Sequence, residues 1–591
     1  MRAWRQFSAA GLLAGAAASL VVTASLVVTA SAAESTAKPD ARAAAALVTP
    51  AAPAAPVGHL AAEVRRVLAD IPLSRSVTAD SSEAPAPQGA VRPLRAGELT
   101  PAEAAAVRTF YQTRGYKPLW VTETGVRPQA TSLLEALRAA DRDGLDPAAY
   151  NVRTLSARLE APGTGAAGQA EIESLLTRAL VRYAVDLGAG RVPGQAAEPG
   201  LYRAAPTVHV SSVLAAVAGA ADIRPVLESL WPSRPAYVAL REALAAHRTM
   251  AAAGGWPTVE DGPTLRVGMS DPRVESLRRR LRATGELTSG DDASPEFDGA
   301  VEEALKAFQR RHGLEEDGAV GRQTLLTLNV PVQRRIRQII INLERLRWVP
   351  DNLGSRYILV NVAAAEMALF ENGQPVLSMR VIVGQPKRPT PLLNASMTHL
   401  VLNPVWNVPH HLAVEDVVTK VRQDRSYFTK QGLRIFGMRE EGIGELDPAS
   451  VDWDKAGVRG FPYQLRQDPG PKNAMGRIKF LLPNREDIYL HDTPTRNIFQ
   501  KASRAASSGC IRLEKPLELA AYVLKDRQGW TRDRIEATVE GGKTETVSLK
   551  HPLPVYLAYR TAWVGAEGTV EFRSDIYDRD KRLMGLLFST P

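Results

Sequence analysis

The sequence contains only one cysteine, Cys510, among its 591 residues. A single cysteine excludes any disulfide within the chain, so the thiol has no internal partner even in an oxidising compartment. The sequence also lacks the Cys and His spacing of zinc fingers, a P-loop and any dense basic tract. Nucleic acid is therefore the weakest explanation of the net charge of +9, and an anionic polymer or membrane surface suits it better.

Long uncharged runs are equally scarce, and the one that stands out begins the chain. Arg2 and Arg5 form a basic start, and the stretch from Phe7 to Ala33 then carries no charge. Residues 1–33 predict an export signal, with a small-residue cleavage site at Ala30-Ser31-Ala32. A retained membrane anchor needs about 20 such residues, so a cleaved signal and an anchor stay open as alternatives.

Residues 34–96 are rich in Ala, Pro and Ser, which predicts a linker, with one helix expected at 60–71. Residues 97–260 predict a mostly helical region without a cluster of acids, histidines or metal ligands. Its first helix should begin at Thr100-Pro101-Ala102-Glu103, a capping box with proline at the first helical position. Further helices are expected at 130–141, 171–187 and 236–246.

Residues 262–331 predict a compact module of three helices. Apolar residues repeat at helical spacing around Leu277 and Leu281, and again around Leu305 and Phe308. A third, short helix should follow the Asp317-Gly318 turn. A segment of roughly seventy residues buries only a small core, so we expect modest stability.

Residues 334–591 change to strands after an amphipathic helix at 334–348. Asn372-Gly373 predicts a hairpin turn between early strands, and residues 410–472 interrupt the strands with a helical, charged and irregular insertion. A helix is expected at 516–527, and strands at 536–538, 555–563 and 569–573. The expected fold class is multidomain α+β: a helical scaffold, a small three-helix module and a β-rich domain with an insertion.

Cys510 and His491 are the candidate chemical pair. His491 ends an apolar, β-prone run, and the Ser507-Ser508-Gly509 turn delivers Cys510 nineteen residues later. A free thiol has a pKa of about 8.5, and an imidazole can take its proton, so the two can form a nucleophile with its base. The amides of Gly509 and Cys510 are candidate donors to an oxyanion. The alternative from these residues alone is a small buried cysteine without a catalytic role.

The segment from His491-x-Thr493 to Ser507-Ser508-Gly509-Cys510-Ile511-Arg512 resembles the signature of the L,D-transpeptidase catalytic domain, a cysteine acyltransferase of bacterial cell walls. The family often carries His or Arg where this chain has Ser508. The order Val383-Gly384, Thr390-Pro391 and Asn-Pro-x-Trp-x-Val-Pro at 403–409 is similar to the large members of this family. By the same resemblance, 97–260 looks like their scaffold domain, 262–331 like the type 1 peptidoglycan-binding domain, 334–591 like the catalytic domain and 410–472 like its cap insertion.

The resemblance implies a periplasmic or cell-envelope enzyme that forms 3→3 cross-links between peptidoglycan stem peptides and is a carbapenem target. Cys510 would be the nucleophile and His491 the base, oriented by the backbone carbonyl of Asp492, while the Gly509 amide would bind the oxyanion. Substrate contacts are expected from four further residues, Arg512, Tyr489, Trp406 and Ser508. No cofactor and no metal are expected, because nothing near His410-His411 completes a metal site.

Several alternatives stay open at this point. Water as the acceptor would make the enzyme a carboxypeptidase, and a lipoprotein lysine would make it an anchoring enzyme. A chain that keeps the fold without activity would be a non-catalytic wall-binding scaffold. The three-helix module either binds the wall or orients the catalytic domain. Expected partners are peptidoglycan stem peptides and glycan, together with other cell-wall synthesis proteins, and no nucleic acid.

Overall fold

The computed structural model describes residues 58–73, 96–161, 165–198, 201, 206–350, 352–439, 442–456 and 460–588. The predicted export signal or anchor at 1–33 and most of the predicted linker at 34–96 lie outside these residues. None of the helices in the described ranges is long and apolar enough to cross a membrane.

The N-terminal part of the described chain is helical, as predicted. Helix α2 (Pro101–Thr113) begins with the predicted capping box: the Thr100 hydroxyl accepts the Glu103 amide, and the Glu103 carboxylate accepts the Thr100 amide at 2.8 Å. Helix α5 (Gly165–Gly188) is buried along most of its length, with α1, α3, α4 and α7 packed against it. The remaining α-helices and strands of this region are α1 (His59–Ala69), β1 (Val121–Thr122), β2 (Gly125–Val126), α3 (Pro128–Arg138), α4 (Val152–Glu160), α6 (Gly194–Ala197), α7 (Val210–Gly219), α8 (Arg224–Glu228) and α9 (Pro235–Ala252).

The predicted three-helix module is present and consists of α10 (Arg273–Ala283), α11 (Gly299–Arg311) and α12 (Arg322–Leu328). Gln309 is fully buried at the end of α11 and holds the turn that follows. Its Nε2 donates to Asp317 Oδ1 at 2.7 Å, and its Oε1 accepts the Gly318 amide at 2.9 Å. The contacts of Gln309 with Asp317 and Gly318 therefore stabilise the fold of the module itself.

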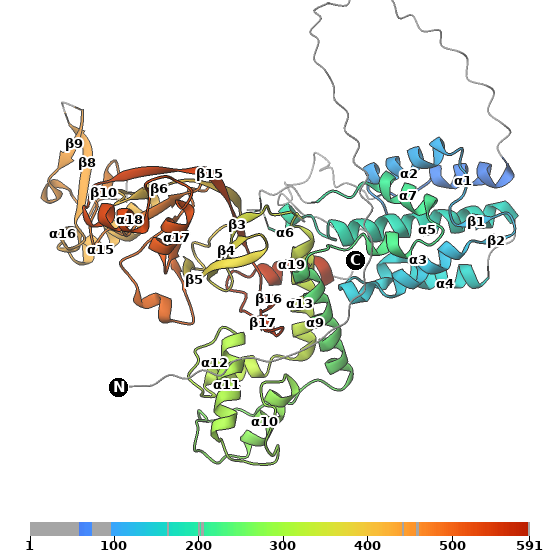
Figure 1. The fold of residues 1–591 in the computed structure, drawn as a ribbon, viewed down its shortest axis with the longest axis horizontal. Helices are drawn as coiled ribbons and strands as arrows, with labels where there is room; N and C mark the ends of the chain where they lie inside the picture. Colours follow the sequence, from blue (N-terminus) through green and yellow to red (C-terminus); the bar gives the residue numbers. More distant parts are fainter. Residues whose placement is uncertain are drawn as a thin grey trace, which may run out of the picture. The chain divides into compact units, whose positions relative to one another are not determined.

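Helix α13 (Val332–Arg347) runs beside α9 (Figure 1). It leads into a sheet that closes on itself. The strand order is β13-β5-β14-β12-β11-β6-β15-β3-β4, and β5 also pairs with β4, which closes the ring. Apolar side chains at alternate strand positions fill its interior, as in a small barrel. The strands are β3 (Arg356–Asn361), β4 (Glu366–Glu371), β5 (Gln374–Gly384), β6 (Asn394–Leu402), β11 (Ile478–Leu481), β12 (Leu490–His491), β13 (Ala505–Ser507), β14 (Ile511–Leu513) and β15 (Glu545–Ala558).

The C-terminal part contains more helix than the sequence predicted. Residues 536–538 lie in α18 (Arg532–Glu540) and not in a strand, because Thr531 caps a helix there and Ile535 anchors it in the core. Helix α17 (Pro516–Val523) is shorter than expected, and the predicted strand 555–563 is divided between β15 and β16 (Ala562–Val564). Strand β17 (Val570–Phe572) pairs with β16, and α19 (Arg579–Phe588) follows.

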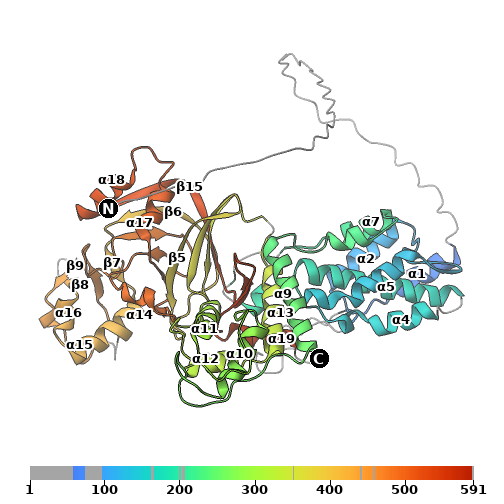
Figure 2. The same ribbon diagram turned by 60° about the horizontal axis from the view of Figure 1, so that its bottom comes forward.

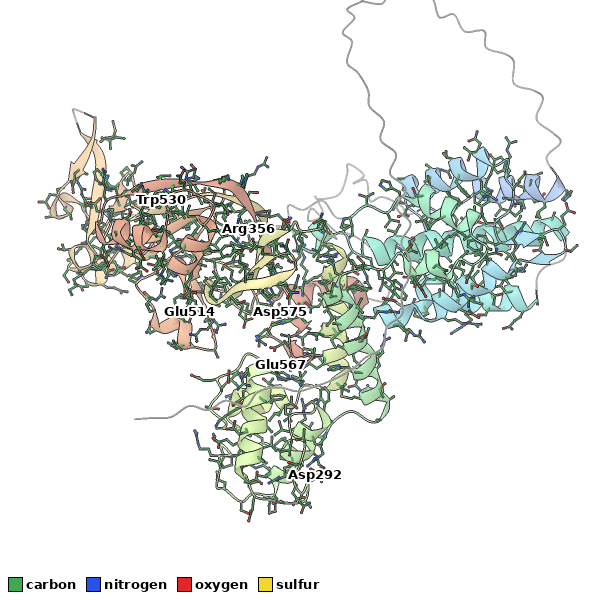
Figure 3. All side chains as sticks on the ribbon, viewed as in Figure 1. Asp292, Arg356, Glu514, Trp530, Glu567 and Asp575 are labelled. Atoms are coloured by element: carbon green, nitrogen blue, oxygen red, sulfur yellow. The ribbon has the colours of Figure 1, made fainter. Side chains whose placement is uncertain are left out.

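Glu514, which Figure 3 labels, directly follows β14 and accepts a hydrogen bond from Arg380 Nε at 2.9 Å.

The insertion at 410–472 has a small sheet of its own, which corrects the expectation of a helical and irregular segment. Strands β8 (Leu433–Arg439), β9 (Gly442–Leu446) and β10 (Gln464–Gln467) join β7 (Trp406–Val408) in the order β7-β10-β8-β9. One face of this sheet packs into a separate hydrophobic core, which contains Leu433, Ile435 and Leu465. Short helical pieces pack beside it (Figure 2): α14 (His410–Leu412), the π-helical turn η3 (Ala413–Val418), α15 (Thr419–Gln423) and α16 (Tyr427–Lys430).

Candidate active site

Parallel pairing of β12 with β14 brings the two halves of the predicted site together. Leu490 lies opposite Ile511, and both side chains are fully buried in the barrel core. Side chains alternate along a strand, so the residues on either side of this pair face the other way. That outer face carries the four predicted side chains, Tyr489, His491, Cys510 and Arg512, and the register explains how residues nineteen positions apart share one site.

Strand β11 adds Lys479, which the sequence analysis did not identify. Lys479 pairs opposite His491, while its neighbours Ile478 and Phe480 are buried in the barrel. The Lys479 Nζ atom lies 3.9 Å from the centre of the Tyr489 ring, a cation–π contact. The alternation Ile478-Lys479-Phe480 is the signal that places this lysine on the outer face.

These side chains line a cavity of about 980 Å³ between the barrel and the insertion. All four predicted substrate contacts line it: Arg512, Tyr489, Trp406 and Ser508. The insertion contributes His410, His411, Asp416 and Lys420 to the opposite wall. A cavity of this volume is in the range of ligand sites, so it has room for a peptide segment beside Cys510.

The Cys510 side chain is half-buried, and its surroundings favour the protonated thiol. Burial raises the pKa of the thiol, and hydrogen bonding from Tyr489 and the nearby charges of Lys479 and Arg512 lower that pKa only in part. The Sγ atom lies 3.8 Å from the carbonyl oxygen of Asp487, to which it donates. The resting nucleophile is therefore a thiol and not a thiolate.

The His491 imidazole is also neutral at rest. Burial, followed by the charge of Arg512, lowers the pKa of His491 to about 3, while the backbone at Asp492 and Met475 opposes this shift. A neutral imidazole keeps a free lone pair at neutral pH and can accept the thiol proton. The pair consequently combines a protonated nucleophile with an unprotonated base.

The Asp492 carbonyl is close to His491, but its predicted role in orienting the ring stays a prediction. Within the described part of the chain, the buried Nδ1 atom of His491 has no partner with hydrogen-bond geometry. The Asp492 carboxylate fixes the chain after His491, since it accepts the Arg477 amide at 2.9 Å and Arg496 Nη1 at 3.0 Å. A Cβ atom on Gly476 would lie 2.5 Å from this carboxylate, which explains the glycine there.

Ser507 organises the loop that carries the nucleophile. Its hydroxyl donates to the Cys510 carbonyl at 2.6 Å and accepts the Gly509 amide at 3.2 Å. The Gly509 amide, predicted to bind an oxyanion, is thus already engaged, and that role stays a prediction. Gly509 has a φ of +116°, a conformation that favours glycine, so this turn requires a residue without a side chain.

Arg388 approaches the same loop from the segment between β5 and β6. Its Nη1 donates to Ser508 Oγ at 3.1 Å, so a guanidinium lies beside a position where the family resembled often has a basic residue. The same side chain is bound by Glu415 and Asp416 of the insertion. No pattern in the sequence indicates Arg388, because only the fold brings it to the cysteine loop.

His410 and His411 line the cavity wall. The Nε2 atom of His410 lies 3.1 Å from the carbonyl oxygen of Phe461. The described ranges contain no group of three His, Cys, Asp or Glu side chains placed to hold a metal ion.

Three family models match separate parts of the chain. Residues 105–244 match "Scaffold domain", 270–328 match "Putative peptidoglycan binding domain" and 355–542 match "L,D-transpeptidase catalytic domain". The last of these ranges contains Cys510, His491 and every other side chain of the cavity's barrel wall described above.

Curated relatives match parts of the chain. A "Putative L,D-transpeptidase" of Haemophilus influenzae is 36% identical over 267 residues, which cover 44% of this chain and 53% of that protein. The "N-acetylmuramoyl-L-alanine amidase CwlM" of Mycobacterium tuberculosis is 38% identical over 80 residues, which cover 12% of this chain and 20% of that protein. The chain therefore spans about half the length of the first relative and a fifth of the second.

Among solved structures, an L,D-transpeptidase from Stackebrandtia nassauensis aligns with 51% of this chain and 98% of its own at 12% identity and a TM-score of 0.21, a similarity too low to inform the fold. The matches to family models and to the Haemophilus protein are specific. The chain carries an L,D-transpeptidase catalytic domain, preceded by a scaffold domain and a peptidoglycan-binding domain.

Proposed function

We propose that the protein is a cysteine L,D-transpeptidase that joins peptidoglycan stem peptides through a thioester on Cys510. The observation that carries the proposal is the β12–β14 register, which brings the thiol, the imidazole and Arg512 to one face of the cavity, where the β11–β12 pairing adds Lys479. The match to the catalytic-domain model covers this face. The peptidoglycan-binding domain supports the same polymer as the substrate.

In the first half-reaction the Cys510 sulfur attacks the carbonyl that precedes a terminal D-Ala of the donor stem. The thiol proton moves to His491 as the sulfur–carbon bond forms, because neither group is charged at rest. The proton then passes to the departing amine, the carbon–nitrogen bond breaks and D-Ala leaves. General base catalysis of this kind contributes about 10²–10⁴-fold to the rate.

In the second half-reaction an amine of another stem attacks the thioester. His491 takes the proton of that amine, the carbon–sulfur bond breaks, and the proton returns to the sulfur of Cys510. A stem-peptide amine gives a 3→3 cross-link. Water would instead give a hydrolysed tripeptide, and a lipoprotein lysine would give an anchored protein.

Lys479 and Arg512 give the cavity a preference for acidic substrates. Within the described residues neither side chain has a carboxylate at ion-pair distance, and the Arg512 Nε atom is buried without a partner. Burial lowers the pKa of both groups, and for Lys479 the charge of Asp487 opposes this shift only in part. A substrate carboxylate would supply the missing charge, and stem peptides carry such groups.

The sequence features outside the described ranges extend this proposal. The uncharged segment at 7–33 supports export to the periplasm, either with cleavage or with retention as an anchor. A carbapenem would act as a trapped acyl donor on Cys510. Contacts with other cell-wall synthesis proteins remain part of the proposal.

The test is incubation of the purified protein with tetrapeptide muropeptides, followed by mass analysis of the products. The proposal predicts release of D-Ala and a dimer joined through the amine of a second stem, both absent with Cys510→Ala. Tripeptide without dimer would identify water as the acceptor. Unchanged tetrapeptide, from a folded protein with an alkylatable thiol, would refute the proposed activity.

A further inference from the structure

Arg388 connects three segments that are far apart in the sequence. It lies between β5 and β6, and its guanidinium reaches the η3 turn of the insertion and the loop before Cys510. Its Nη2 donates to Glu415 at 2.6 Å and to Asp416 at 2.9 Å. Its Nη1 donates to Asp416 at 2.7 Å and to Ser508 Oγ at 3.1 Å.

The geometry is that of a fork rather than a chance surface contact. Nη1 donates to Oδ2 of Asp416 and Nη2 donates to Oδ1, which is the bidentate pairing that gives an arginine–carboxylate contact its strength and direction. The Arg388 side chain is 18% exposed, while Asp416 is 38% and Glu415 is 58% exposed. The arginine is therefore largely shielded from solvent, whereas both carboxylates are exposed to it. We expect added salt to weaken these ion pairs without abolishing them.

The insertion side of this contact is an irregular helix. The η3 turn (Ala413–Val418) is π-helical, a form that occurs mostly as short segments and often at functional sites. Val417 and Val418 anchor it in the insertion's own core, and Asp416 lines the active-site cavity. A movement of this turn would therefore move one wall of the cavity.

We propose that Arg388 is a positioning residue that clamps the insertion to the loop carrying Cys510. Its contact with Asp416 holds the cavity wall in place. Its contact with Ser508 holds the loop at a position two residues before the nucleophile. Closing the insertion and setting the cysteine loop are then one event, which excludes water from the thioester only when the loop is in place. The proposal rests on the proposed function for this last consequence, but not for the mechanical coupling itself.

The first test measures the coupling by hydrogen exchange in the full chain. Arg388→Gln removes the charge, and Asp416→Asn removes the same ion pair from the other side. We expect each to raise amide exchange in both 410–423 and 505–510 by about tenfold, the loss of one partly exposed charge-assisted contact. The double variant should not exceed Arg388→Gln, because that change already removes the contact with Asp416. Arg434→Ala is the matched control, because Arg434 pairs with Glu445 at 2.7 Å and with Asp468 at 2.8 Å within the insertion's sheet region.

The second test uses features that a merely structural side chain would not share. Arg388→Lys keeps the charge but not the fork, so its exchange should fall between that of the wild type and Arg388→Gln. In 1 M salt the wild-type exchange in both segments should rise toward that of Arg388→Gln, with the variant itself little changed. If Arg388→Gln fails to fold, Asp416→Asn carries the same comparison.

Exchange that rises in 410–423 while 505–510 stays at the wild-type level would overturn the coupling, as would no change in either segment. With tetrapeptide substrate, the clamp predicts a severalfold higher ratio of tripeptide to cross-link in Arg388→Gln. Amide hydrogen exchange needs no peptidoglycan. An absence of transpeptidase activity would therefore refute the proposed function, while the exchange results would still test the clamp.

Discussion

Replacing His491 by glutamine should remove a large part of the acid sensitivity of the catalytic domain. The pKa of His491 is lowered from 6.5 to about 3, and the side chain is only 2% exposed. The unfolded chain therefore binds a proton below pH 6.5 that the folded chain does not bind until about pH 3. Stability from this group is fully present above pH 6.5 and is lost as the pH falls.

The size of the effect follows from the same two values. A shift from 6.5 to about 3 corresponds to about 5 kcal/mol in full, at 1.36 kcal/mol per pKa unit. At pH 4 the unfolded state is protonated and the folded state is still mostly neutral, so about 3 kcal/mol of that difference has been lost relative to pH 7. One kilocalorie is a large fraction of the stability of a typical domain, so the effect should be measurable.

The assay is urea unfolding of the wild type and His491→Gln at pH 7 and pH 4, followed by hydrogen exchange of 478–513 to isolate the catalytic domain. Other groups that titrate in this range are common to both proteins and cancel in the difference. His551→Gln, which removes an exposed histidine from β15, controls for the loss of a histidine. An equal loss of stability between pH 7 and pH 4 in the wild type and His491→Gln would refute the buried neutral imidazole.

Three further predictions concern the same site. Iodoacetamide alkylation of Cys510 should rise with pH up to the raised pKa of the thiol, without the plateau between pH 5 and 7 that a thiolate–imidazolium pair would give. Lys479→Met should raise the thiol pKa further and slow alkylation at pH 7, because the lysine charge favours the thiolate; unchanged alkylation would remove Lys479 from the site's electrostatics. Ser507→Ala should cost ~1–3 kcal/mol in urea unfolding, since it leaves the Gly509 amide without its acceptor in a buried loop, and a cost near zero would mean that the loop is held by other contacts.

Local rules predicted the regular parts of this protein well. The capping box at Thr100 places helix α2 within one residue, and Asn372-Gly373 forms the predicted hairpin turn with both residues at positive φ. The Cys510 and His491 pair followed from residue type and from the resemblance, and the β12–β14 register accounts for its placement. The helix start and the hairpin turn depend on contacts between near neighbours, whereas the placement of the pair depends on a strand pairing distant in sequence.

The remaining features depend on contacts that no local pattern encodes. Lys479 reaches the site only because β11 pairs with β12, and Arg388 only because the β5–β6 segment passes the cysteine loop. The insertion's sheet was missed because charged residues such as Arg434 and Arg466 on its open face obscure the apolar alternation of Ile435 and Leu465. Residues 536–538 read as a strand because the helix there is short and buries little beyond Ile535.

The most direct test of the central claim is the intact mass of the protein after brief exposure to a tetrapeptide stem. The account predicts an added mass equal to that of the tetrapeptide minus the released D-Ala, which is the tripeptide minus one water. The adduct should be located on Cys510 by peptide mapping and removed by hydroxylamine, as expected of a thioester. The adduct should be absent with Cys510→Ala and should form far more slowly with His491→Gln. A folded protein that turns over the stem peptide without mass on Cys510, or that carries the acyl group on another residue, would contradict the account.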